Sequence, residues 1–243
     1  MSLQALRVSL VIPCRNESAR LPLALPQLQA FADAAEYAVE VVIVVEKSTD
    51  DTARIAQDFA ATDPRFRAIC RETAHGKGRA VSIGMVEANG DRVIFMDTDL
   101  SVPLRYVNEF LPYLEDAEVV FGSRRHPESI IVQAQPWQRV VVGRVFNLGL
   151  RTLSATTFRD TQCGFKAFRR EAAQSIFSKM TVDGFGFDVE VLARAEALGY
   201  TVVERPVEWS DGAGSTVRAW RVGSQAFFEA VGAGWRARKE NFL

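Results

Sequence analysis

The sequence predicts an α/β fold in which helices flank a mostly parallel sheet, arranged as a single domain. Short apolar runs alternate with helical patterns along the chain, as is typical of βαβ units. The run at 39–45 is almost wholly apolar, as expected for a strand covered on both faces. The 243 residues fit one large α/β domain better than two small ones, and no repeat or linker interrupts them.

The expected elements follow a regular order in the first half of the chain. Strands are predicted at 8–13, 39–45, 66–70, 92–96 and 119–121, and Pro13 is expected to end the first. Helices are predicted at 18–35, 51–61, from the 75–78 loop to 88, and at 104–114. Residues 48–50 offer an N-cap for the second helix, and Pro103 suits the first position of the last one. Beyond residue 125 we expect a loop and one helix over 126–160, strands at 163–169 and 201–205, and helices at 171–178 and 187–198.

Composition and charge exclude several classes of protein. The formal net charge of -1 gives no global basic field, so we expect no nucleic acid partner. Cys14, Cys70 and Cys163 are too dispersed for a disulfide framework or zinc knuckle, and we expect them to be small buried residues. No apolar segment approaches the ~20 residues that a spanning helix needs. We therefore expect a cytoplasmic protein, with peripheral contact at the cytoplasmic membrane face as the closest approach to a bilayer.

Two stretches could make that contact. The first is the apolar segment 140–150, which lies beside Arg139. The second is a C-terminal helical pattern that places Trp220, Phe227, Val231 and Trp235 on one face. This face could lie at a membrane interface, but amphipathic helices more often pack on their own domain, and we favour packing.

Asp97-Thr98-Asp99 directly follows the apolar strand at 92–96. Ligands of open α/β sheets bind at the carboxyl ends of the strands. Two carboxylates one residue apart can approach one divalent cation that bridges a diphosphate, and Mg²⁺ or Mn²⁺ suits such oxygen ligands. The alternative is that Asp97 and Asp99 only cap the helix that follows Pro103.

The loop His75-Gly76-Lys77-Gly78-Arg79 is a second candidate for phosphate binding. Glycines let the backbone approach a phosphate, and Lys77 and Arg79 supply positive charge. A solvated basic loop is the alternative. No glycine-rich fingerprint follows the first strand, which excludes a nicotinamide-dependent oxidoreductase.

Seven segments occur in the order known from family 2 glycosyltransferases. They are Val11–Glu17, Glu46–Thr52, Gly76–Gly78, Met96–Asp99, Gly122–Arg124, Arg159–Lys166 and Phe187–Glu190. The chain therefore resembles this family over about residues 8–216. The last two segments resemble the branch that contains dolichyl-phosphate glucosyltransferases and dolichol-phosphate mannose synthases.

The resemblance implies a GT-A fold over 1–243, with about 1–122 binding the nucleotide sugar and about 123–243 binding the acceptor. It implies an inverting enzyme that moves a hexose, with glucose favoured, from a nucleotide diphosphate sugar to a polyprenyl or dolichyl phosphate. UDP-glucose is the favoured donor. The alternatives are GDP-mannose as donor, a soluble or glycan acceptor, and a nucleotide-sugar-binding protein without turnover.

The resemblance also assigns roles to single residues. The residues assigned to the nucleotide-sugar site are Pro13, Asn16, Glu17, Glu46, Lys77, Asp97 and Asp99. Asp99 and Asp97 are assigned as ligands of the metal, Mg²⁺ or Mn²⁺. Arg124 and Arg139 match arginines that hold the acceptor phosphate, and Asp188 matches the position of a catalytic base. An anionic phosphate acceptor needs positioning by arginines, whereas an alcohol acceptor needs Asp188 as general base.

Two positions depart from the family pattern. Val45-Glu46 stands where two consecutive acids are usual, so the usual contact to the nucleobase is altered. Ser101 stands downstream of Asp99 at a position that can hold a metal-binding side chain. Metal dependence is expected, but these residues do not define a complete ligand set.

Overall fold

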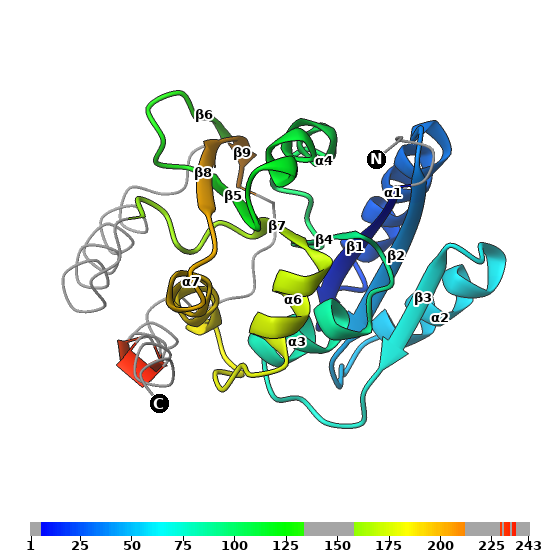
Figure 1. Ribbon diagram of the computed structural model, residues 1–243. Helices are drawn as coiled ribbons and strands as arrows, with labels where there is room; N and C mark the ends of the chain where they lie inside the picture. The colour runs from blue at the N-terminus through cyan, green and yellow to red at the C-terminus, as the bar shows by residue number, and fades with distance from the viewer. Residues whose placement is uncertain (1–5, 134–157, 212–228, 230, 234, 237–243) are drawn as a thin grey trace.

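A seven-stranded sheet runs through the protein (Figure 1). The computed structural model describes residues 6–133, 158–211, 229, 231–233 and 235–236. In sheet order the strands are β3 (Phe66–Cys70), β2 (Ala38–Val45), β1 (Arg7–Cys14), β4 (Arg92–Met96), β7 (Phe165–Arg169), β5 (Val119–Ser123) and β8 (Val202–Pro206). All point the same way except β7, which is antiparallel to both β4 and β5. The predicted mostly parallel sheet is confirmed.

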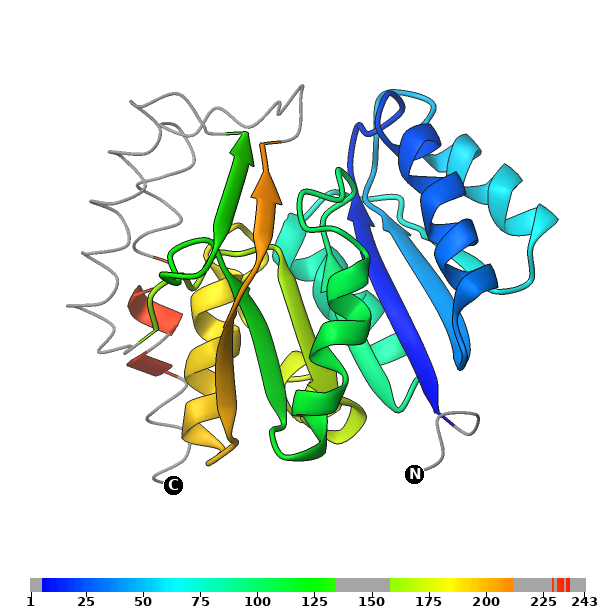
Figure 2. The same cartoon turned by 90° about the horizontal axis from the view of Figure 1, so that it is seen from above.

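Helices cover both faces of this sheet. One face carries α1 (Leu21–Ala34), α2 (Thr52–Thr62) and α4 (Arg105–Phe110); the other carries α3 (Lys77–Glu87), α6 (Arg170–Phe177) and α7 (Phe187–Ala197). Figure 2 shows α1 and α2 beside β1 and β2. The helix expected at 104–114 is divided into α4 and the 3₁₀ helix η2 (Pro112–Glu115), because Pro112 has no N–H to continue an α-helix.

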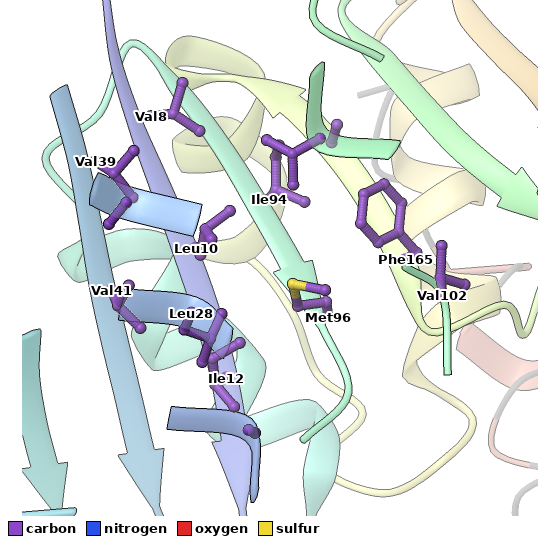
Figure 3. Close-up of a cluster of buried hydrophobic side chains, with 14 of the residues drawn as sticks. Val8, Leu10, Ile12, Leu28, Val39, Val41, Ile94, Met96, Val102 and Phe165 are labelled. Atoms are coloured by element: carbon purple, nitrogen blue, oxygen red, sulfur yellow. The ribbon is translucent and has the colours of Figure 1, made fainter. Parts of the chain in front are cut away.

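Alternation along each strand divides the core into two clusters. Leu10 and Ile12 of β1 pack with Leu28 of α1, as Figure 3 shows, whereas Val11 between them belongs to the cluster under α3, α6 and α7. Successive side chains of a strand point to opposite faces, so a strand buried on both faces has to be apolar throughout. This is the physical reason for the nearly continuous apolar runs in the sequence.

The prediction that Pro13 ends the first strand is wrong. β1 continues to Cys14, and Pro13 pairs with Val44 of β2. Pairing between β1 and β4 ends at Val11 and Phe95, and the hydroxyl of Thr98 donates to the Pro13 carbonyl instead. Because the ladder on that side has already ended, the missing N–H of proline removes no strand hydrogen bond.

A second, two-stranded sheet was not predicted. β6 (Ile130–Gln133) lies where we expected only a loop and a helix, and it pairs in parallel with β9 (Glu208–Ser210), which follows the last predicted strand. Two contacts join this sheet to α4. The Glu208 N–H donates to the Tyr106 hydroxyl at 2.7 Å, and Arg105 forms an ion pair with Glu208. β6 is only four residues long and lies outside the regular alternation of strands and helices. It therefore gives no periodic signal in the sequence.

The cysteines are as expected except at one position. All three are free, and Cys14 and Cys163 are buried, but Cys70 is exposed because it ends the edge strand β3. Within the described ranges, no helix has both the length and the apolar character needed to cross a bilayer.

Candidate active site

The predicted site residues meet at the carboxyl edge of the sheet. β1, β2, β4 and β5 end together there, so the loops that follow them carry Asn16, Glu46, Asp97 and Arg124 to one edge. β7 begins at this edge because it is antiparallel, with Phe165 opposite Met96. The single reversed strand therefore brings a further segment, Gly164 to Lys166, into the same site.

Asp97 is enclosed by a lysine and a glycine. Its Oδ1 lies 2.6 Å from Nζ of Lys77, the first residue of α3. A Cβ added to Gly164 would lie 2.2 Å from Oδ2 of Asp97, so a larger residue there would displace this carboxylate. Burial lowers the pKa of Lys77, but the charges of Asp97 and Asp188 outweigh this and raise it. Lys77 is therefore a cation at neutral pH.

The carboxylate of Asp99 is hydrogen-bonded to Ser101 and does not cap a helix. Its Oδ1 accepts the Ser101 N–H at 3.0 Å and the Ser101 hydroxyl. The N-cap of α4, Leu104, has no side-chain capping bond. The alternative that Asp97 and Asp99 serve as caps of this helix is therefore not supported.

The loop after β1 is locked to the loop after β2. Asn16 has a φ of 53°, a left-handed conformation that asparagine tolerates better than most residues. Its Oδ1 accepts the Thr49 N–H at 2.8 Å, and its own N–H donates to the Ser48 hydroxyl at 3.1 Å. Ser48-Thr49-Asp50 thus supports the candidate nucleotide pocket, a role that its assignment as a helix cap did not include.

Glu17 connects this pocket to the acids after β4. Its carboxylate accepts two hydrogen bonds from Arg20, at 2.6 and 2.5 Å. The third guanidinium nitrogen of Arg20 lies 3.9 Å from Oδ2 of Asp99. Burial raises the pKa of Glu17, and the charges of Asp99 and Asp97 raise it further, although Arg20 opposes the shift. The site therefore concentrates negative charge next to a cation.

Glu46 has a role that the sequence did not reveal. The residue is 2% exposed, and its Oε2 accepts the N–H groups of Gly76, at 2.9 Å, and His75. Its Oε1 lies 3.5 Å from Nε of Arg71. Glu46 therefore fixes the start of the loop that carries Lys77. A contact from Glu46 to the nucleobase stays a prediction.

The glycines of the 76–78 loop are required by a neighbouring loop. Gly76 has a φ of 139°, and a Cβ there would lie 2.4 Å from the Asp183 carbonyl oxygen. A Cβ on Gly78 would lie equally close to the Val182 carbonyl. Glu190 of α7, which is fully buried, holds that second loop by accepting the Val182 N–H at 2.8 Å. Close packing explains the glycines in this motif.

Arg124 forms a paired group with Asp160. Its Nε and one terminal nitrogen donate to the two Asp160 oxygens at 2.7 and 2.8 Å, and its backbone N–H donates to Oδ2 at 2.9 Å. Burial alone raises the pKa of Asp160, but the charge and hydrogen bonds of Arg124 dominate and lower it to about 2. The Arg124 guanidinium also lies 5.6 Å from the centre of the Trp209 ring. The sequence motif contains Asp160 but did not predict this pairing.

Asp188 lies in a buried ion pair with Lys166. Lys166 is fully buried, and its Nζ lies 2.5 Å from Oδ1 of Asp188 and donates to the Cys163 carbonyl at 2.8 Å. Burial raises the pKa of Asp188, and Lys166 and Lys77 oppose that shift without cancelling it. Sequence reasoning noted Lys166 within a motif but gave it no function.

The remaining expectations fall on residues outside the described ranges. These are Arg139, the apolar segment 140–150, and Trp220 and Phe227. Trp235 is described and is 58% exposed.

The oxygen donors of the site suit a divalent cation. The carboxylates of Asp97 and Asp99 and the hydroxyl of Ser101 are the hard ligands that Mg²⁺ and Mn²⁺ prefer. Among the residues that the structure describes, no cluster of three or more His, Cys, Asp or Glu side chains could hold a metal ion. The donor set therefore fits a metal held by one or two carboxylates together with substrate phosphates.

These features define an α/β protein with a candidate nucleotide-diphosphate site at the carboxyl edge of its sheet. The family model described as "Glycosyl transferase family 2" matches residues 9–177. The chain belongs to glycosyl transferase family 2, and the expectation of a glycosyltransferase enzyme is confirmed.

Similar proteins agree with this family. The glycosyltransferase AglD of Haloferax volcanii is 32% identical over 83% of this chain, which spans 33% of AglD. A dolichyl-phosphate beta-glucosyltransferase of Drosophila melanogaster is 31% identical, with 87% of this chain and 69% of that protein covered. The chain thus spans about a third of the first relative and about two thirds of the second.

Solved structures confirm the GT-A fold. Glucosyl-3-phosphoglycerate synthase of Mycobacterium tuberculosis, solved with Mn²⁺, UDP and glucosyl-3-phosphoglycerate, superposes with a TM-score of 0.68 at 19% identity, covering 96% of this chain and 80% of that one. Mannosyl-3-phosphoglycerate synthase of Rubrobacter xylanophilus gives 0.67 at 21% identity, covering 98% and 76%.

The Lys166–Asp188 pair predicts a strong energetic coupling. Lys166→Met leaves a buried carboxylate without its partner, so we expect a loss of about 3–5 kcal/mol in the free energy of unfolding. Adding Asp188→Leu should restore much of this loss, because no unpaired charge remains. Urea unfolding of the wild type, both single variants and the double variant measures the coupling. Additive losses would contradict it.

The Arg124–Asp160 pair predicts a change in acid stability. The pKa of Asp160 is lower in the folded protein than its ordinary value of 3.8, so its contribution is complete above pH 4 and is lost as the pH falls towards 2. The free energy of unfolding of Asp160→Asn should fall less steeply than that of the wild type between pH 4 and 2. Urea titrations at stepped pH test this, and parallel slopes would reject the assigned pKa.

Proposed function

We propose that the protein transfers a hexose, with glucose favoured, from UDP-glucose to a polyprenyl or dolichyl phosphate, with inversion at the anomeric carbon. The observation that carries the proposal is the convergence of Lys77, Asp97 and Asp99 at the carboxyl edge, in a chain that is similar to dolichyl-phosphate glucosyltransferases. One phosphate oxygen of the acceptor forms a bond to the anomeric carbon. The bond from that carbon to the diphosphate breaks, and UDP leaves with the electron pair.

The donor side of the site has to bind and stabilise the diphosphate. A bound Mg²⁺ or Mn²⁺, held by Asp99 and Asp97, supplies positive charge where the leaving group develops negative charge. Lys77 adds an ammonium from the first residue of α3, where helix N–H groups also favour an anion. Pro13, Asn16 and Glu46 belong to the proposed base and ribose pocket. Because these charges are positioned before the reaction, they stabilise the transition state without reorganisation.

The acceptor side favours a phosphate over an alcohol. A phosphate monoester already carries negative charge near neutral pH, so it needs orientation and not deprotonation. The Arg124 guanidinium is rigidly oriented by Asp160, as a positioning group should be. Asp188, by contrast, is hydrogen-bonded to a buried ammonium, which occupies one of the oxygens that a general base would use. Arg139 is proposed as the second arginine of the acceptor site.

The two halves of the chain divide these tasks. We assign about 1–122 to the nucleotide sugar and about 123–243 to the acceptor, within one GT-A domain. Since the proposed acceptor carries a lipid, peripheral contact with the cytoplasmic face of a membrane belongs to the same proposal. The exposed side chain of Trp235 suits such contact.

The donor and the metal can be tested together. We expect calorimetric titration to show Mn²⁺-dependent binding of UDP-glucose in preference to GDP-mannose. Turnover with a polyprenyl phosphate should fall on the order of 100-fold or more in Asp99→Ala, because charge stabilisation at the leaving group is lost. Asp116→Ala, which removes an exposed carboxylate after η2, is the control and should keep wild-type turnover.

Other outcomes separate the alternatives. Preferential binding of GDP-mannose would replace glucose by mannose in the proposal. Transfer to a soluble acceptor but not to a polyprenyl phosphate would overturn the acceptor. Binding without metal dependence or turnover would indicate a nucleotide-sugar-binding protein.

A further inference from the structure

Lys77 contacts the Asp97 carboxylate, which the proposed metal site also uses. We propose that Lys77 fills the cation's position beside Asp97 in the metal-free protein, and that metal binding displaces it towards the diphosphate. Lys77 is then a positioning residue that couples metal binding to nucleotide binding. This inference rests on the proposed metal role of Asp97 and Asp99.

The first support is the contacts of the Asp97 carboxylate. Oδ1 is in contact with Nζ of Lys77 at 2.6 Å, and Oδ2 lies against Gly164 so closely that a Cβ would approach it to 2.2 Å. Lys77 occupies one side of Oδ1, while the Asp97 side chain as a whole is 33% exposed. A divalent cation at Asp97 would repel the adjacent ammonium. Metal binding at Asp97 and the Lys77–Asp97 ion pair therefore oppose each other.

The second support is that the Lys77 side chain has a second favourable position, near the N-terminus of α3. It is the first residue of α3, so its flexible side chain starts where helix N–H groups favour a phosphate. Its Nζ also lies 6.0 Å from the centre of the Phe187 ring, so an aromatic face borders the ammonium. Glu46 fixes the backbone at 75–76 through two N–H groups, so the side chain can move while its anchor stays.

The competition predicts effects of opposite sign in one variant. Without nucleotide, Lys77→Met removes the competing ammonium, so Mn²⁺ should bind about tenfold more tightly. At saturating Mn²⁺, the same variant lacks a cation for the diphosphate, so UDP should bind about tenfold more weakly. A purely structural role of Lys77 would weaken both.

The experiment is calorimetric titration of the full chain with Mn²⁺ alone, and then with UDP at saturating Mn²⁺. Lys77→Arg keeps the positive charge and should stay within about twofold of the wild type for Mn²⁺. Lys179→Met is the matched control, because it removes an exposed lysine that follows α6, and it should change neither affinity. Circular dichroism verifies the folding of each variant. If Lys77→Met does not fold, Lys77→Gln provides the uncharged comparison.

Two results would overturn the inference in distinguishable ways. If Mn²⁺ binds the wild type and Lys77→Met equally, and Asp99→Ala abolishes that binding, the metal site stands but the competition does not. If Mn²⁺ binds no variant, even with UDP present, the metal role in the proposed function fails and the competition fails with it.

Discussion

The arrangement of the site depends on one constraint, the need of a fully buried ammonium for a carboxylate partner. Lys166 has no solvent contact, and an unpaired charge in that position would be prohibitively costly. Its partner, Asp188, is on the first turn of α7, so the ion pair ties that helix to β7. Because β7 alone runs antiparallel, it presents its first residues, and not its last, at the carboxyl edge. The reversed strand and the buried pair together join the two halves of the site.

Buried carboxylates also shape the loops around that pair. Glu46 accepts backbone N–H groups at 75–76, and Glu190 accepts those at 181–182. The two loops pack so closely that Gly76 and Gly78 leave no room for a Cβ. Each carboxylate replaces water for N–H groups that would otherwise be unsatisfied, and such charged acceptors are stronger than neutral ones. The backbone position of Lys77 is thus fixed by Glu46 on one side and by the 181–184 loop on the other.

The sequence predicted those features that local pattern determines. β3 and β4 were placed at their observed bounds because each is a short apolar run between polar residues, and Asp97 and Asp99 were placed at the site because they directly follow β4. Pairing between distant residues was not predictable: Arg124 and Asp160 are 36 positions apart and Lys166 and Asp188 are 22 apart. The antiparallel direction of β7 and the β6–β9 sheet likewise depend on tertiary contacts and have no periodic signature.

The same pairing of charges explains why Asp97 and Asp99 are not equivalent. Lys77, Arg124 and Lys166 each contact a carboxylate at 2.5–2.7 Å, so most cations of the described site are already neutralised. Asp99 differs, since its nearest cationic partner there is Arg20 at 3.9 Å, and Arg20 already has two hydrogen bonds to Glu17. A carboxylate with so little compensation attracts an external cation most strongly. In the proposed function, Asp99 is accordingly the residue that a divalent metal would bind first, whereas at Asp97 the metal would compete with Lys77.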